Sequence, residues 1–119
     1  MKYIGLLVGY NDPDYSWASA SEEEQAAEMS AHGAFSEAVE RREDSALLGG
    51  EALTDGDSAT VLRQVDGELT LTDGPFSEAT EGIGGFYLLD APNLDVAVEL
   101  FAALKPYVIE IRPVDTSVS

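Results

Sequence analysis

The single histidine of the chain, His32, is the residue most suited to acid–base chemistry, because an imidazole gains and loses a proton near neutral pH. The spacing of the residues around it predicts a helix whose buried stripe carries His32. The other members of that stripe are Met29, Phe35 and Val39. A histidine placed in this way points towards a sheet and can shuttle protons there. The alternative is a packed histidine that is hydrogen-bonded to a backbone carbonyl or to Glu28.

A second candidate is the carboxylate of Asp73, which ends an alternating apolar strand and begins the sequence Asp73-Gly74-Pro75-Phe76. Gly74 permits unusual backbone angles, and Pro75 fixes φ and ends the strand pairing. Phe76 adds apolar surface, so the segment should form a rigid corner that holds the carboxylate beside an apolar wall. Such a setting raises a carboxyl pKa. The alternative is an Asx-type turn with a hydrophobic plug.

Three other charged residues are weaker candidates for ligand contacts. Glu51 follows two glycines, and Arg63 and Arg112 fall inside predicted strands. A carboxylate and a guanidinium on adjacent strands also form structural ion pairs. One histidine and scattered acidic residues give no spacing typical of a metal site, so we expect neither a metal nor another cofactor.

The composition limits the partners and the location of this protein. Its 119 residues suit one domain, and the lack of cysteine excludes a disulfide framework or a cysteine-based metal centre. The chain carries 23 acidic and 6 basic residues, a net charge of −17, so its surface should repel nucleic acids and anionic membranes. That surface is either simply solvated or meets a cationic partner. The first apolar run is too short for a signal peptide, and no stretch approaches the roughly 18 apolar residues of a membrane span, so we expect a cytoplasmic protein.

The helix that carries His32 has clear signals at both ends. Ser21 and Glu24 form a capping box, which predicts that a helix of about 20 residues begins at the next position after Ser21. Arg41 and Arg42 should lie in its last turn, where cations suit the helix dipole. This long helix should lie on a sheet.

Strand patterns fill most of the remaining chain. The first strand reads as buried on both faces, and Gly49-Gly50 should place a bulge or a close backbone approach in the second. Asp66-Gly67 predicts a type I′ turn between the third strand and the fourth. The predicted strands span residues 2–9, 46–53, 59–65, 68–72, 84–91 and 107–114.

A second helix, amphipathic and capped by Asn93, is expected over residues 93–104. The resulting order, β-α-β-(ββ)-β-α-β, is the α+β, ferredoxin-like pattern: an antiparallel sheet with two helices on one face and an added hairpin. One domain should span residues 1–114, followed by a flexible tail over 115–119. Because both helices lie on one face, apolar residues on the other face need cover. A second copy would supply it, and this predicts a homodimer with the form of a dimeric α+β barrel.

Several segments of the chain carry a resemblance to a known family. The most distinctive is TDGPFSEATEGIGGFYLLDAPNLDVAVELFAAL, followed by IEIRPV, and the others are KYIGLLVGY, MSAHGAFSEAV, LLGGEAL and ATVLRQVDGELTLTDGPF. On these segments the chain resembles the YCII-related family, in the branch named for its DGPF motif, over nearly its whole length from Lys2 to Val114. Family members usually carry a lysine after the motif, where this chain has Thr80. A ligand contact made by that lysine would be missing here.

The resemblance implies a dimeric α+β barrel and a cleft with a conserved histidine and aspartate. The matching positions are His32 and Asp73, with Glu51 as a weaker match. We therefore expect His32 and Asp73 to act as an acid–base pair on a small organic molecule. The residues expected to bind this molecule are Glu51, Gly74, Pro75, Phe76, Arg63 and Arg112. The alternative is a non-catalytic dimer that binds a metabolite or a regulatory protein, since some members are joined to or encoded beside sigma factors.

Overall fold

The computed structural model of the chain describes residues 1–12, 14–54, 58–74 and 83–117. The strands are β1 (Lys2–Tyr10), β2 (Ala46–Ala52), β3 (Thr60–Val65), β4 (Glu68–Asp73), β5 (Gly85–Asp90) and β6 (Tyr107–Pro113), and the helices are α1 (Glu22–Glu40) and α2 (Leu94–Phe101). A four-stranded antiparallel sheet has the order β2-β5-β1-β6, and β3 pairs with β4 in a separate two-stranded sheet. This arrangement is consistent with the predicted ferredoxin-like α+β fold.

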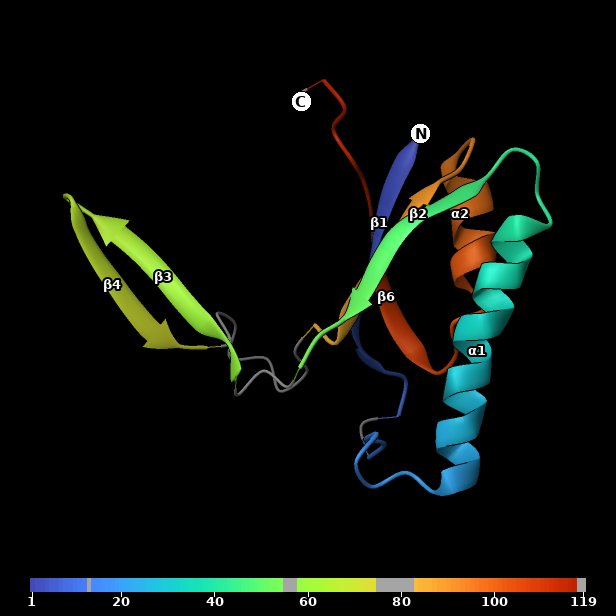
Figure 1. Cartoon of the computed structure of the whole chain (residues 1–119), viewed down its shortest axis with the longest axis horizontal. Coiled ribbons are helices and arrows are strands. Elements are labelled where there is room, and N and C mark those ends of the chain that lie inside the picture. The colour runs from blue at the N-terminus through green and yellow to red at the C-terminus, as the bar shows by residue number, and fades with distance from the viewer. Residues whose placement is uncertain (13, 55–57, 75–82, 118–119) are drawn as a thin grey trace.

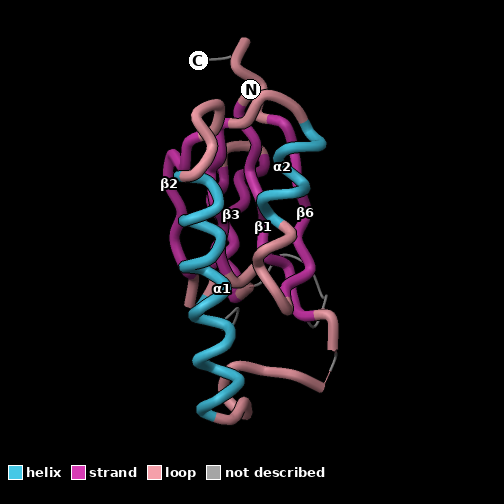
Figure 2. Tube along the Cα trace, turned by 90° about the vertical axis from the view of Figure 1, so that its right-hand side faces the viewer, coloured by secondary structure: helices cyan, strands magenta, loops and turns pink. Residues whose placement is uncertain are grey.

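Both helices pack on the same face of the four-stranded sheet, as Figures 1 and 2 show. Phe35 of α1 is fully buried and stacks on Phe101 of α2, with ring centroids 5.3 Å apart. Gly5 of β1 lies under Phe101, where a Cβ atom would come within 2.6 Å of the ring. The other buried apolar side chains are Tyr3, Leu7, Val39, Leu89, Ala91, Ala97, Leu100 and Leu104. Neither helix of the described part is long and apolar enough to cross a membrane.

The start of α1 agrees with the prediction, and its end does not. Ser21 accepts a hydrogen bond from the backbone N–H of Glu24, and the Glu24 carboxylate accepts one from the backbone N–H of Ser21, so the capping box is confirmed. The helix stops before Arg41, which is its C-cap. The prediction that Arg41 and Arg42 lie in the last turn is therefore wrong. Arg42 instead pairs with Asp44, 2.9 Å away in the following turn.

The prediction that β1 is buried on both faces is wrong for a single chain. Along this strand, buried Tyr3, Gly5 and Leu7 alternate with half-buried Ile4 and Leu6. The buried set faces the helix layer, and in Figure 1 no described helix or strand is packed over the other face. Within the part of the chain that the structure describes, one apolar face of the four-stranded sheet therefore has no covering layer.

The hairpin of β3 and β4 extends from the side of the sheet opposite the helices (Figure 1). The predicted type I′ turn is supported, because Asp66 and Gly67 both have positive φ, at 51° and 82°. Strand alternation places three leucines on one face of the hairpin, where they are 56–60% exposed. We call these residues, Leu62, Leu69 and Leu71, the leucine face. An isolated two-stranded hairpin is marginally stable in water, and among the described residues no other element covers the leucine face.

Candidate functional site

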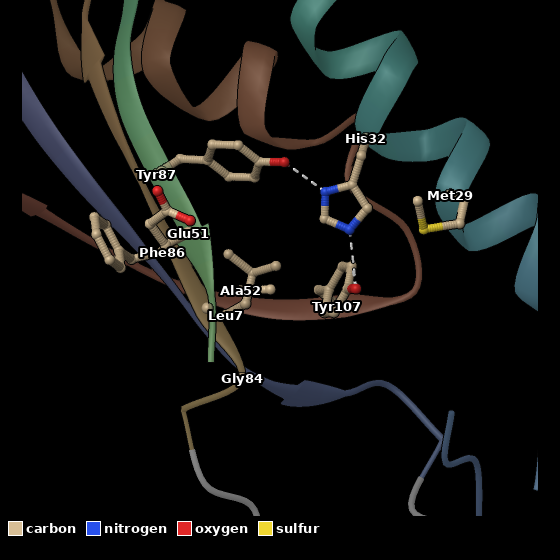
Figure 3. Close-up of a pocket in the computed structure, with 11 residues that line it drawn as sticks. Leu7, Met29, His32, Glu51, Ala52, Gly84, Phe86, Tyr87 and Tyr107 are labelled. Carbon is tan, nitrogen blue, oxygen red and sulfur yellow. Dashed lines mark hydrogen bonds between the residues drawn. The ribbon is translucent and has the colours of Figure 1, made fainter. Parts of the chain in front are cut away.

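His32 lies between α1 and the sheet and is hydrogen-bonded to two tyrosines (Figure 3). Its Nδ1 atom is 2.6 Å from the hydroxyl oxygen of Tyr87 on β5. Its Nε2 atom is 3.0 Å from the hydroxyl oxygen of Tyr107 on β6. The prediction that His32 points towards the sheet is therefore confirmed. Both ring nitrogens have side-chain partners, and neither partner is Glu28 or a backbone carbonyl, which the sequence offered as the alternative.

Glu28 is a buried carboxylate at the centre of a group of tyrosines. It is only 3% exposed and lies one helical turn before His32 on α1. Tyr10 donates a hydrogen bond to Oε1 over 3.1 Å, Tyr15 donates to Oε2 over 2.6 Å, and Tyr107 donates to Oε1. These hydroxyl donors replace the water that a carboxylate loses on burial, which is what allows such a group to remain inside a protein.

Strand pairing brings the tyrosines to the same place. Tyr10 ends β1, Tyr107 begins β6, and the two are partners in the antiparallel register with rings stacked 5.2 Å apart. Tyr15 comes from the loop before α1 and packs edge-on against Tyr10, with centroids 4.7 Å apart. Tyr87 on β5 packs against Phe35 at 4.7 Å. We call the following residues the tyrosine network: Glu28, His32, Tyr10, Tyr15, Tyr87 and Tyr107.

Burial and the Glu28 carboxylate shift the acid–base properties of this network. Burial and the nearby negative charge raise the pKa of Tyr10 to about 12. The hydrogen bond to Glu28 and burial raise the pKa of Tyr15, and burial together with the same kind of bond raises the pKa of Tyr107. Burial lowers the pKa of His32, although the charge of Glu28 acts in the opposite direction. At pH 7 the tyrosines therefore keep their protons and His32 is the neutral imidazole.

These shifts predict a loss of stability in alkali. The folded pKa of Tyr10 lies above the unfolded value of 10.0, so its contribution to folding is complete below pH 10 and is lost as the pH rises through about 12. Tyr15 and Tyr107 act in the same direction. We expect wild-type protein to ionise these phenols late in an alkaline titration followed by phenolate absorbance, and Glu28→Gln to ionise them at lower pH. Identical titrations of the two proteins would contradict the influence of the Glu28 charge.

A cavity of about 330 Å³ opens beside His32, at the end of the sheet where β2 and β5 are paired (Figure 3). Its lining residues are Leu7, Met29, His32, Gly50, Glu51, Ala52, Gly84, Gly85, Phe86, Tyr87 and Tyr107. Polar side chains on this wall are the imidazole, the two tyrosines that flank it and one carboxylate. The remaining side chains are apolar, and glycines bring the backbone close to the cavity.

The structure does not bring Asp73 to His32 within one chain. Asp73 ends β4, and the hairpin that carries it lies on the opposite side of the sheet from α1 (Figure 1). The backbone N–H of Gly74 forms one further hydrogen bond across the base of the hairpin. Neither Asp73 nor Gly74 lines the cavity. Pro75 and Phe76 lie outside the described residues.

Of the three weaker candidates, only Glu51 lines the cavity. It pairs with Phe86 across β2 and β5, so its side chain belongs to the sheet face opposite Tyr87 and meets the cavity at the end of the sheet. Arg63 on β3 and Arg112 on β6 do not line it. Within the described ranges, no three His, Cys, Asp or Glu side chains are grouped so as to hold a metal ion.

Sequence reasoning misses the tyrosines and the central place of Glu28. The signal for Glu28 is helical spacing, since it begins a series that continues with His32, Phe35 and Val39 after four, three and four residues. The stripe predicted from the sequence contains Met29 instead, and that prediction is wrong because Met29 is 62% exposed. No local pattern points to the tyrosines, because only the pairing of distant strands brings them together.

The predicted bulge in β2 is confirmed by a shift in its register with β5. Gly49 and Gly50 of this strand provide a matched test of how closely its backbone approaches Tyr87. A Cβ atom on Gly50 would lie 2.5 Å from the ring of Tyr87 and 2.7 Å from the carbonyl oxygen of Phe86. One on Gly49 would meet nothing within 4 Å. We expect Gly50→Ala to lower the free energy of unfolding by about 1–3 kcal/mol and to shift the NMR signals of His32. Gly49→Ala should change stability by less than about 0.5 kcal/mol, and equal effects would contradict the close approach.

Two comparisons with known proteins found sequences similar to this chain. The family model described as the YCII-related domain matches residues 1–114. An uncharacterised protein of Rhizobium meliloti (strain 1021) is 35% identical over 97 residues, which cover 78% of this chain and 73% of the relative. The span of the family match includes every member of the tyrosine network.

Proposed function

The chain belongs to the YCII-related family, and we propose that it binds a small organic molecule in the cavity beside His32 and acts on it by proton transfer. The observation that carries this proposal is the imidazole of His32, hydrogen-bonded through both nitrogens on the wall of a cavity of about 330 Å³. A volume of that order holds a small ligand. An imidazole in its neutral form is the side chain best suited to take up a proton at pH 7.

The lining of the cavity indicates the kind of molecule that it would take. Apolar side chains and glycines form most of the wall, and no lysine or arginine of the described residues contributes to it. An anion would meet the carboxylate of Glu51 there without a compensating cation, which is unfavourable. The proposed ligand is therefore uncharged or cationic, and mostly apolar.

We further propose that the chain belongs to the DGPF branch of the family and works as a homodimer. The branch is supported by the sequence Asp73-Gly74-Pro75-Phe76 at the end of β4. The dimer is supported by two apolar surfaces that one chain leaves open, namely the sheet face opposite the helices and the leucine face of the hairpin. Two copies related by twofold symmetry would cover both surfaces in one contact.

The acid–base pair of His32 and Asp73 is proposed to form between two copies. Asp73 is two residues after Leu71 on β4, as Leu71 is after Leu69, so the three side chains lie on the same face of the hairpin. If the leucine face packs against a second copy, Asp73 would lie in the same contact. The cavity beside His32 is open to that side at Glu51, a residue of the uncovered face. We expect Asp73→Asn to lower the pKa of His32, because loss of a nearby negative charge disfavours the imidazolium. An unchanged His32 titration in NMR spectra would remove Asp73 from the site.

Light scattering tests the dimer and the surface that forms it. Leu71→Asp places a charge in the leucine face and should yield a monomer at micromolar concentration, where the wild type has twice the chain mass. Val65 provides the matched control, since it is 64% exposed on the other face of the same hairpin. Val65→Asp should leave the dimer intact. A monomeric wild type contradicts the homodimer, and equal behaviour of the two variants contradicts the leucine face as the contact.

Thermal-shift screening against small organic molecules tests ligand binding. A molecule present at a hundred times its Kd stabilises the folded state by about 2.7 kcal/mol, which raises Tm by several degrees. We expect hits among uncharged or cationic, mostly apolar compounds. The shift should be lost in His32→Ala and kept in Glu37→Gln, which changes an exposed position of the same helix. Compounds that stabilise all three proteins alike bind outside the cavity.

Turnover of these hits separates an enzyme from a binding protein. Conversion by the wild type, lost in a folded His32→Ala variant, is the result expected for proton-transfer catalysis. A molecule that binds in the cavity and is recovered unchanged would instead support the non-catalytic alternative, a ligand-binding or regulatory dimer.

A further inference from the structure

We propose that Glu28 orders the hydrogen bonds of the tyrosine network in one direction, so that His32 is held as the Nε2–H tautomer and Tyr87 offers its oxygen only as an acceptor. The site would then take a proton from a ligand that carries an O–H or N–H group. The direction of the hydrogen bonds rests on their geometry and on the neutral state of His32 at pH 7, and the statement about the ligand rests on the proposed function.

The direction begins at the Glu28 carboxylate. An ionised carboxylate only accepts hydrogen bonds, and the hydroxyls of the three tyrosines around it, Tyr10, Tyr15 and Tyr107, donate to it. A phenolic hydroxyl has a single hydrogen. Since Tyr107 commits that hydrogen to Glu28, its oxygen can only accept from its other neighbour, Nε2 of His32 at 3.0 Å.

The same reasoning passes through the imidazole to Tyr87. A neutral imidazole carries one N–H group and one bare nitrogen. Because Nε2 of His32 donates to Tyr107, Nδ1 is the bare nitrogen and must accept. The hydroxyl of Tyr87, 2.6 Å from Nδ1, therefore donates its hydrogen to His32. In this series Tyr87 donates to His32, His32 donates to Tyr107, and Tyr107 donates to Glu28, which only accepts.

Several elements of the fold contribute titratable groups that face this series. Glu28 and His32 come from α1, Tyr87 from β5 and Tyr107 from β6. The carboxylate is further surrounded by a hydroxyl from the end of β1 and one from the loop before α1. The only formal charge within the tyrosine network is therefore that of Glu28, at the end of the series away from the cavity.

The direction decides what the site can do to a ligand. Since the hydrogen of Tyr87 is committed to His32, a ligand on the Tyr87 oxygen must supply the hydrogen of that contact. When the ligand's O–H or N–H bond breaks, its proton joins the Tyr87 oxygen, and the former Tyr87 hydrogen moves to Nδ1 of His32. The Nε2 hydrogen then moves to Tyr107, whose own hydrogen moves to Glu28. The ligand keeps the electron pair and Glu28 becomes a neutral carboxyl group, so no oxidant or reductant is needed. A cationic ligand with an N–H group becomes neutral in this step, which suits a cavity that is unfavourable to anions.

NMR spectroscopy of His32 tests the direction without any ligand. The chain has one histidine, so its ring nitrogens give a single set of signals. Long-range proton–nitrogen correlation spectra distinguish the two neutral tautomers. We expect the Nε2–H form in wild-type protein at neutral pH, and observation of the Nδ1–H form would overturn the proposal.

Tyr107→Phe and Tyr10→Phe are a matched pair of variants. Both hydroxyls donate to Oε1 of Glu28 and the two rings stack, but only Tyr107 also reaches His32. We expect Tyr107→Phe to release His32 into a mixture of tautomers and Tyr10→Phe to preserve the Nε2–H form. Glu28→Gln should act like Tyr107→Phe, because a carboxamide can also donate. An unchanged tautomer in Tyr107→Phe, or equal effects of the two phenylalanine variants, overturns the proposal even if Glu28→Gln fails to fold.

The probes 4-methylphenol and 4-methylanisole test the acceptor role of Tyr87. They are similar in size, but only the phenol has a hydrogen to donate. Titrations followed on the His32 ring signals should show the wild type binding the phenol about tenfold more tightly, and Tyr87→Phe binding the two alike. Equal or tighter binding of the ether by the wild type overturns the acceptor role. If neither probe binds, the proposed cavity function fails, and the tautomer measured without ligand still decides the direction.

Discussion

Glu28→Ala is expected to lower the free energy of unfolding by about 3 kcal/mol, because it removes the acceptor of three tyrosine hydroxyls from the interior. A hydrogen bond to a charged group contributes about 1.5–3 kcal/mol. The loss is smaller than the sum of three such bonds, since Tyr10 and Tyr15 are only partly buried and can turn towards water. Urea unfolding followed by circular dichroism measures the change.

Two further substitutions show whether the buried charge is responsible. Glu28→Gln keeps the shape of the side chain and one acceptor oxygen, so it should cost about half as much as Glu28→Ala. Glu37→Ala removes a carboxylate from the exposed surface of the same helix, where it only pairs with Arg41 at 3.4 Å, and should cost less than about 0.5 kcal/mol. Similar losses at Glu28 and Glu37 would contradict the structural role of the buried carboxylate.

Phe35→Ala is expected to cost about 4 kcal/mol, because it empties the centre of the core. Phe35 is fully buried, stacks on Phe101 and packs against Tyr87. The cavity left behind would be bounded by both helices and the sheet, and neighbouring side chains can fill it only in part. Loss of the contact with Tyr87 should also displace the hydrogen bond to His32, which NMR signals of the single imidazole would report.

Controls for this substitution come from the same helix. Phe35→Leu keeps most of the apolar volume and loses the ring contacts, so it should cost less than about 1.5 kcal/mol. Met29→Ala shortens an apolar side chain that is 62% exposed and should change stability by less than about 0.5 kcal/mol. A loss at Met29 as large as the loss at Phe35 would contradict the assignment of the buried stripe.

Because His32 and Asp73 are separated within one chain, the proposed homodimer would have a direct role in the proposed chemistry. The helix layer carries His32, and the hairpin that carries Asp73 extends from the opposite side of the sheet (Figure 1). In the proposed homodimer, a contact between copies would bring them together. The tyrosine network, in contrast, is complete within one chain, so its tautomer and titration can be measured whether or not the dimer forms.

Local features of the fold could be predicted from the sequence because neighbouring residues determine them. Three such features depend on residues within three positions of one another: the capping box of Ser21 and Glu24, the Asn93 cap and the turn at Asp66. Asn93 accepts a hydrogen bond from the backbone N–H of Val96 over 2.9 Å. The order of strands and helices along the chain is compatible with only a few topologies, and this restriction predicts the antiparallel sheet. The end of α1 was less predictable, since helix termini depend on the chain that follows.

The candidate site could be predicted only in part. His32 was evident as the sole imidazole on a helical stripe, but its partners were not, because Tyr87 and Tyr107 are far from it in the chain and meet it through strand pairing. The sequence indicated Glu28 only as a possible partner of His32. Its buried position was not predictable, because a carboxylate on a buried face is unfavourable unless donors surround it, and those donors are recognisable only after folding.

The sequence by itself determined the family, the two helices with their caps, the hairpin and the single residue able to exchange a proton near pH 7. Those properties arise from side chains close together in the chain and from the periodicity of apolar residues. The tertiary structure alone decided that a buried Glu28 gathers three tyrosine hydroxyls and that two tyrosines flank His32. It also placed Asp73 on the other side of the sheet. Hydrogen bonds between groups on separate strands depend on register and layer, and these are set by packing of the whole chain rather than by any short segment.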